Sequence, residues 1–164
     1  MTRPKKQRGI AVIEFAFVLI PLLVVLTGIT EFGRAMYYYN TLAKSARDAA
    51  RLMSTQAPTD PDYATLQQQA RCTAIYGNVS CSGSPLLPGL ATGMVSFCDP
   101  VSCATTHNNI STGPTTGAIN LVTVTIGGVN NALAFQSLAP FMPSLFGIAG
   151  FNFAPVSVTM RQVS

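Results

Sequence analysis

Glu14 is the residue whose position most demands a chemical role, because it is a carboxylate inside a long apolar run. Sixteen of the 21 residues at positions 10–30 are apolar, and about 20 such residues span a bilayer as a helix. A carboxylate at membrane depth costs roughly 2.5–3.5 kcal/mol and usually marks function. Four basic residues and no acidic residue precede the run. The positive-inside rule therefore places residues 1–9 in the cytoplasm and the bulk of the chain outside.

The four cysteines, Cys72, Cys81, Cys98 and Cys103, all follow the apolar run and so lie on the exported side. An even count in an oxidising compartment indicates two disulfides. Of three pairings we favour Cys72–Cys81 with Cys98–Cys103, because both close short loops, each worth on the order of 2–3 kcal/mol. The alternative is a zinc site that includes His107. Gaps of 8, 16 and 4 residues between the cysteines are not typical of zinc ligands.

Catalytic groups are otherwise scarce. His107 is the sole histidine, and its polar Thr-Thr-His-Asn-Asn context leads us to interpret it as a solvated loop residue. The acids beyond position 58 are Asp60, Asp62 and Asp99, which show no pairing pattern. The sequence has no Ser-His-Asp order, phosphate-binding glycine loop or carboxylate dyad. We therefore expect a protein that is not an enzyme and has no cofactor and no metal.

The composition points to a membrane or envelope protein. Charged residues make up only 10% of the 164 residues and hydrophobic residues 48%, whereas soluble domains carry about 25% charged residues. The net charge of +4 arises from four basic residues within the first eight. The remainder is formally neutral, which excludes the broad basic face that binds nucleic acid.

A stalk helix should follow the apolar run, because apolar residues recur there every three or four positions. Pro58 ends the pattern, so we expect one helix from about residue 10 to 54, roughly 65 Å long, kinked or loosened at Pro21. The stripe could pack against the chain's own outer domain or against neighbouring subunits, and periodicity does not separate the two. Its members are Phe32, Met36, Tyr39, Leu42, Ala46, Ala50 and Met53.

The first 15 residues resemble a type IV prepilin processing signal: a basic leader that ends in Gly9, an apolar residue, and Glu14 fifth after the glycine. The resemblance implies that a membrane aspartic peptidase cuts between Gly9 and Ile10 and leaves the helix attached. Glu14, followed by Phe15, would then act in subunit assembly. The carboxylate would pair with the new amine at Ile10 of a neighbouring subunit, which offsets the desolvation of both charges.

Residues 8–54 look like the N-terminal domain of TadE-like proteins, the minor pseudopilins of the tight-adherence (Tad/Flp) pilus system. The strands expected at 122–126 and 156–161 resemble the family more loosely. Major Flp pilins are much shorter and usually have Tyr after the Glu, so Phe15 favours a minor pseudopilin. The matching elements are Arg8-Gly9, Glu14-Phe15, Pro21, Gly28-x-x-Glu31-x-Gly33-Arg34 and Ala46-Arg47-Asp48-Ala49-Ala50-Arg51.

The outer domain should combine a short helix at 62–76 with two alternating strands, 121–126 and 156–163, paired antiparallel against the stalk. Loop signals dominate residues 77–118. The expected fold is thus α+β, with a pilin-like long N-terminal transmembrane and stalk helix and a small disulfide-bonded outer domain containing an antiparallel β hairpin or sheet. Its divisions are a cleaved leader at 1–9, a transmembrane helix at 10–31, an amphipathic stalk at 32–57 and an extracytoplasmic α+β domain at 58–164.

The apolar segment 138–151 has three interpretations. It could be core beneath a long connection, a tip that docks a partner pseudopilin, or a surface that touches the membrane. A second membrane span is disfavoured because the segment has only 14 residues, two of them proline.

The resemblance implies a minor pseudopilin of a Tad/Flp-type pilus assembly or secretion machine, acting as a structural subunit of an initiating or tip complex. Its partners would be other Tad-type pseudopilins and pilin, prepilin peptidase, inner-membrane pilus platform proteins and membrane lipid, without nucleic acid. It would cross the bacterial inner membrane once, with a cytoplasmic N-terminus and a periplasmic outer domain, and could enter a surface pilus. The alternative is an uncleaved, single-span membrane-anchored envelope protein with a binding or structural outer domain.

Overall fold

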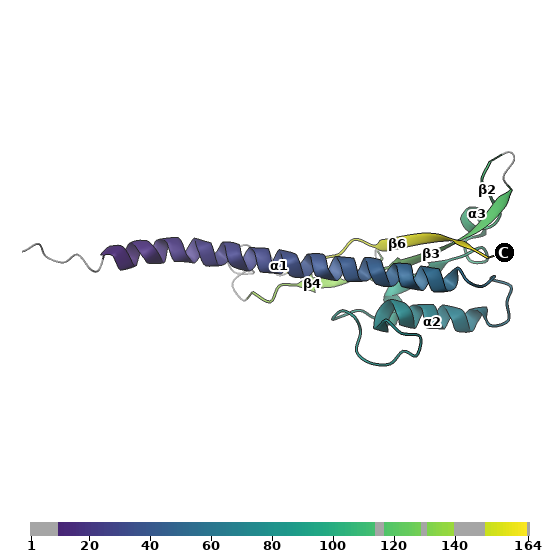
Figure 1. Ribbon diagram of the computed structural model, residues 1–164, viewed down its shortest axis with the longest axis horizontal. Coiled ribbons are helices and arrows are strands. Elements are labelled where there is room, and N and C mark those ends of the chain that lie inside the picture. The colour runs from purple at the N-terminus through teal and green to yellow at the C-terminus, as the bar shows by residue number, and fades with distance from the viewer. Residues whose placement is uncertain (1–9, 114–116, 129–130, 140–149, 164) are drawn as a thin grey trace, which may run out of the picture.

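A single long helix organises the molecule (Figure 1). The computed structural model describes residues 10–113, 117–128, 131–139 and 150–163. Helix α1 runs unbroken over Ile10–Met53, 44 residues, and passes through Pro21. At 1.5 Å per residue it is about 66 Å long. Pro21 removes one backbone donor without ending the helix.

A turn after Met53 leads into helix α2, Tyr63–Tyr76. Helix α2 ends at Gly77, whose φ of 73° is left-handed and whose N–H donates to the carbonyl of Thr73. A residue with a Cβ atom resists that conformation, so glycine suits this helix end. The buried face of α2, which includes Leu66, Ala70 and Ile75, joins that of α1 in one core.

The main sheet is built around strand β3, Ala118–Ile126, with which three other strands pair antiparallel. These are β1 (Val95–Cys98), β2 (Ile110–Ser111) and β6 (Val156–Gln162). A 3₁₀ turn, Thr92–Met94, precedes β1, and the short helix α3, Ala104–His107, lies between β1 and β2. Residues 77–118, where loop signals dominate, therefore also contain two short strands that pair with β3, together with the 3₁₀ turn and α3.

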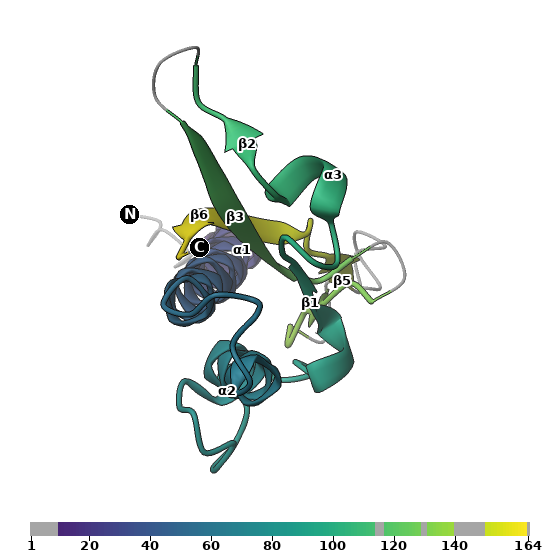
Figure 2. The ribbon, with the colours of Figure 1, turned by 90° about the vertical axis from the view of Figure 1, so that its right-hand side faces the viewer.

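The core lies between the sheet and the two helices (Figure 2). Along β3, Val122, Val124 and Ile126 are buried, while the intervening threonines lie on the opposite face. The alternation follows from the period of two in a strand. On α1, Ala46, Ala49 and Ala50 are fully buried. Their small side chains let the helix lie close to its neighbours.

A second sheet consists of β4, Ala134–Gln136, and β5, Gly150–Asn152, paired antiparallel. Its aromatic residues pack with one another and with α1: the Phe135 ring lies 5.0 Å from that of Phe151 and 5.6 Å from that of Tyr38. This hairpin lies along α1 on the N-terminal side of the main core (Figure 1).

The expected α+β architecture is confirmed, including the antiparallel strands against the stalk helix. The sequence pattern did not indicate β4 and β5. Of the apolar segment 138–151, residues 140–149 lie outside the described residues, so only its two ends are placed.

Candidate membrane and subunit interface

The N-terminal part of α1 is an apolar helix with nothing packed around it. It is long and apolar enough to cross a membrane, and none of its most apolar window is buried in the protein. A core helix of a soluble protein would be mostly covered. Side chains such as Val12, Phe15 and Phe17 are exposed instead. The segment fits a single-pass membrane anchor.

Glu14 lies on this exposed segment. It is four residues after Ile10, the first residue of α1, so the two face the same side of the helix one turn apart. Within the described part of the chain its carboxylate has no hydrogen bond or ion pair. Gly9, the residue before the expected cleavage site, lies outside the described residues. A carboxylate at membrane depth is costly and usually marks a functional site.

The apolar stripe of the stalk divides into two parts. Leu42, Ala46, Ala50 and Met53 are buried against the chain's own outer domain. The first three members are open: Phe32 is 68% exposed, Met36 45% and Tyr39 44%. Packing against the chain's own outer domain, one of the two alternatives left open by periodicity, therefore applies to the C-terminal part of the stripe. The outer domain covers the C-terminal members and leaves the N-terminal members largely exposed.

Glu31 and Arg34 fasten the β4–β5 hairpin to α1. A terminal nitrogen of Arg34, Nη2, lies 2.6 Å from the Glu31 carboxylate and also donates to the Gln136 carbonyl, at 2.6 Å. The other carboxylate oxygen of Glu31 accepts the backbone N–H of Leu138 at 3.1 Å. The Arg34 guanidinium carbon is 4.3 Å from the centre of the Phe135 ring, close enough for a cation–π contact.

These contacts set the ionisation of Arg34. Burial lowers the pKa of the guanidinium, but the hydrogen bond and charge of Glu31, together with Tyr38, raise it by more. Arg34 therefore remains a cation and the pair is neutral overall.

A groove of about 330 Å³ separates the hairpin from α1. The exposed stripe residues Phe32, Met36 and Tyr39 form one wall, and Phe135, Phe151 and Phe153 form the other. Glycine is required at position 150, because a Cβ atom there would lie 2.1 Å from the Phe135 carbonyl oxygen. The groove is thus an apolar feature of the anchor end of the outer domain.

Asp99 is a buried carboxylate at the opposite end of the outer domain, only 2% exposed. Its oxygens accept hydrogen bonds from the Tyr63 hydroxyl, the Gln67 amide, the backbone N–H groups of Val101 and Ser102, and the Ser102 hydroxyl. Burial raises the pKa of Asp99, but the hydrogen bonds from Ser102, Tyr63 and Val101 lower it by more, so its pKa lies below the ordinary value.

Tyr63 extends this network to the end of the stalk. Its hydroxyl oxygen accepts the Gln162 amide at 3.0 Å, and that amide also donates to the Met53 carbonyl. Burial raises the pKa of Tyr63 to about 12, opposed by the Gln162 hydrogen bond and reinforced by the charge of Asp99. The network joins α1, α2, β6 and the turn after β1, which is a structural role.

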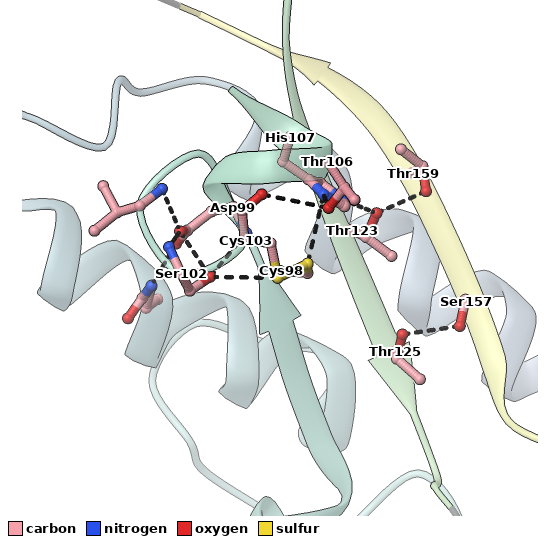
Figure 3. Close-up of a disulfide and its surroundings, with 12 residues drawn as sticks. Cys98, Asp99, Ser102, Cys103, Thr106, His107, Thr123, Thr125, Ser157 and Thr159 are labelled. Carbon is pink, nitrogen blue, oxygen red and sulfur yellow. Dashed lines mark hydrogen bonds between the residues drawn. A yellow bond between two sulfur atoms is a disulfide. The ribbon is translucent and has the colours of Figure 1, made fainter. Parts of the chain in front are cut away.

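The structure contains the disulfides Cys72–Cys81 and Cys98–Cys103, the pairing that short loops favour. Figure 3 shows the second disulfide beside Asp99 and His107. Sulfur atoms of both cysteines lie within 4.8 Å of a nitrogen of His107, a spacing compatible with metal ligation. The disulfide, however, uses both thiols, which need to be free thiolates to bind zinc.

The interpretation of His107 as a solvated loop residue is wrong. It ends α3 and is half-buried, and its two ring nitrogens each lie 2.7 Å from a threonine hydroxyl, that of Thr123 on β3 and that of Thr106. Thr123 in turn lies 2.7 Å from Thr159 on β6 (Figure 3). His107 therefore packs the disulfide turn onto the outer face of the sheet.

In the sequence, Glu31 and Arg34 stand out only as part of the family motif, and the motif alone indicates no role for them. Their spacing of three on a helix does signal an ion pair. Asp99 shows no pairing pattern with the other acidic residues, so the sequence did not single it out. Its place three residues before Ser102 is typical of a side-chain-to-backbone turn and could have identified it.

Residues 9–51 of the chain match the TadE-like protein family. The match covers nearly all of α1, including Glu14, Glu31 and Arg34, and stops before the outer domain. The resemblance drawn from the sequence is confirmed over this range. No curated protein and no solved structure matches the chain.

Proposed function

We propose that this chain, whose long helix matches the TadE-like family, is a minor pseudopilin of a Tad/Flp-type pilus assembly or secretion machine. It acts as a structural subunit of an initiating or tip complex and carries out no catalysis. The observation that carries the proposal is Glu14: a carboxylate without a partner in the described chain, on an exposed helix of membrane length, one turn after Ile10.

Processing supplies the missing partner. A prepilin peptidase removes residues 1–9 and leaves an amine at Ile10. Glu14 of one subunit then neutralises that amine on its neighbour, which sets the axial register, while the adjoining Phe15 packs between helices. Two charges that are costly alone in the membrane become tolerable as a pair.

The division of the stalk stripe supports a subunit that assembles through its anchor end. Met36 and Tyr39 are exposed and pack against neighbouring pseudopilins or pilin. The buried members of the stripe, from Leu42 to Met53, hold the outer domain in place. The inner-membrane platform proteins and membrane lipid are the remaining partners.

In this proposal the chain crosses the bacterial inner membrane once. Its basic leader is cytoplasmic, residues 10–31 span the bilayer, residues 32–57 form the stalk and residues 58–164 form the periplasmic domain. Two disulfides in that domain support an oxidising location.

The test is the mature N-terminus. We would express the full chain with and without its prepilin peptidase and determine the first residue by intact mass and N-terminal peptide sequencing. A start at Ile10 only when the peptidase is present is the expected result. Gly9→Val should block the cut, whereas Gly28→Val, in open space on the same helix, should be cut normally.

Two outcomes would overturn the proposal. A start at Met1 or Thr2 with the peptidase present would favour an uncleaved, membrane-anchored envelope protein. A cut near residue 30 would show that the apolar run is a signal peptide.

A further inference from the structure

We propose that the β4–β5 hairpin is a second membrane contact, in which Leu138 and Phe32 of α1 rest on the lipid of the leaflet nearest the outer domain and Phe151 lies above them among the headgroups. The inference rests on the membrane placement of α1 in the proposed function. It does not depend on processing or on assembly with other subunits.

The hairpin lies alongside α1 in a defined register. Phe135 packs on Tyr38, the Gln136 carbonyl meets Arg34, and the Leu138 N–H meets Glu31. Three residues of strand advance about 10 Å, and seven residues of helix about 10.5 Å. Strand β4 therefore runs alongside α1 and antiparallel to it, toward the membrane end of the helix. Leu138 lies at the level of Glu31.

That level is the edge of the bilayer. A hydrocarbon core of about 30 Å takes about 20 helical residues, so a span that begins at Ile10 leaves the core near residue 30. Leu138 thus lies within one helical turn of the boundary. Tyr37 and Tyr39 are exposed in the next turns, and tyrosines concentrate at membrane interfaces.

The surface at this level is apolar and uncovered. Leu138 is 75% exposed and Phe32 68%. Phe151, 48% exposed, pairs with Phe135 beside Tyr38 and so lies about 10 Å farther from the hydrocarbon core, at the headgroup level. Glu31 and Arg34, the charged groups nearest to it in the described chain, neutralise each other. The surface continues directly from the lipid-facing side of the span, so the bilayer that receives α1 also covers it. Lipid is therefore the occupant we assign, rather than a second subunit.

The chain has no tryptophan, so single-tryptophan variants report their own surroundings. We would place Trp at Leu138 in the full chain, reconstitute it in phosphatidylethanolamine–phosphatidylglycerol vesicles, and compare vesicles with and without brominated acyl chains, which quench tryptophan on contact. Phe151→Trp is a second reporter in case the first perturbs the hairpin. Val18→Trp, within the span, is the positive control.

The matched negative control is Val101→Trp. Val101 is 71% exposed and lies in the turn of Asp99, which Tyr63 and Gln162 connect to Met53. Met53 is 22 residues beyond Glu31 on α1, about 33 Å farther from the membrane.

We expect Leu138→Trp to lose much of its fluorescence in brominated vesicles, more strongly when the bromine lies near the headgroup. Phe151→Trp, farther from the hydrocarbon core, should lose less, and Val101→Trp none. Unquenched hairpin reporters beside a quenched Val18→Trp would overturn the inference and leave the anchor intact. A change in the fluorescence of the hairpin tryptophans that depends on protein density in the vesicles, and not on brominated lipid, would also overturn the inference, in favour of contact with a second copy of the chain. An unquenched Val18→Trp would overturn the membrane placement on which the proposed function depends.

Discussion

The guanidinium of Arg34 lies over the ring of Phe135, 4.3 Å from its centre, and so joins the stalk helix to a strand far along the chain. The same guanidinium binds Glu31 and the Gln136 carbonyl. One side chain thus combines a charge pair, a backbone hydrogen bond and an aromatic contact. It determines where the hairpin lies along α1.

Replacement of Arg34 should release the hairpin without unfolding the main core. Arg34→Ala removes all three contacts, at a local cost of about 2–3 kcal/mol. Arg34→Lys keeps the charge but not the planar fork, so its loss should be intermediate. Hydrogen exchange of the peptide at 134–139 measures the effect. Arg47→Ala is the control, because the hydrogen bond that Arg47 makes in the described chain, to the Ala43 carbonyl, lies within its own helix. Unchanged exchange in Arg34→Ala would contradict the role given to this residue.

Gly150→Ala should disrupt β4–β5 pairing, because the new methyl group would collide with the Phe135 carbonyl. We expect faster exchange in both strands and unchanged protection in β3. Gly33→Ala adds the same methyl group in open space and should stabilise α1 by up to about 1 kcal/mol. Equal protection of β4 in the two variants would show that the close approach is absent in solution.

Asp99 and the Cys98–Cys103 disulfide should stabilise the same turn. Asp99→Asn should cost about 1–3 kcal/mol, and the paired Cys98→Ser/Cys103→Ser change about 2–3 kcal/mol. The combined variant should lose less than the sum, by at least about 0.5 kcal/mol, as measured by denaturant unfolding. Cys72→Ser/Cys81→Ser is the control pair and should add independently to Asp99→Asn. If the losses in unfolding free energy also add for Asp99→Asn and Cys98→Ser/Cys103→Ser, Asp99 and that disulfide are not coupled.

Stability should fall at both ends of the pH range. The pKa of Asp99 is below its ordinary value of 3.8, so its contribution is complete above about pH 4 and is lost as the pH falls through the folded value. The pKa of Tyr63 rises from 10.0 to about 12, so its contribution is lost between those two values. The free energy of unfolding is measured against pH for each variant. Tyr63→Phe should remove the decline in stability at alkaline pH, and Asp99→Asn should remove the decline at acidic pH. A Tyr63→Phe curve parallel to wild type above pH 10 would contradict the assignment.

Glu14→Ala should leave the protein cut and membrane-bound but unable to support piliation, because the Ile10 amine loses its counter-charge. Complementation of a deletion strain, scored for pili, measures this. Glu14→Asp keeps the charge and should rescue in part. Normal piliation with Glu14→Ala would eliminate the proposed charge pair.

Long periodic segments were predictable because their signals are local. The apolar run and the three-to-four spacing predict α1, and the alternation of valine and threonine predicts the pairing of β3 with β6. The point where the stalk stripe changes from buried to exposed, between Tyr39 and Leu42, was not predictable. It depends on how far the outer domain extends along α1, which no local pattern records.

The short strands escaped prediction for a related reason. Strands β4 and β5 have three residues each, too few for periodicity, and contacts with Arg34 and Glu31 hold them. His107 was misjudged because polar neighbours usually mean solvent. Here its hydroxyl partners are Thr106 beside it and Thr123 on the polar face of β3, and the fold brings the latter to the ring.

The bond from the Gln162 amide to the Met53 carbonyl joins residues 109 positions apart. Strand β6, which carries Gln162, helps α2 and β3 to cover the alanine face of α1, so the cover of that face is incomplete until β6 is available. Contacts between segments this far apart in a chain form more slowly than the local contacts of a helix. The outer domain therefore cannot close on the stalk helix before β6 has been synthesised.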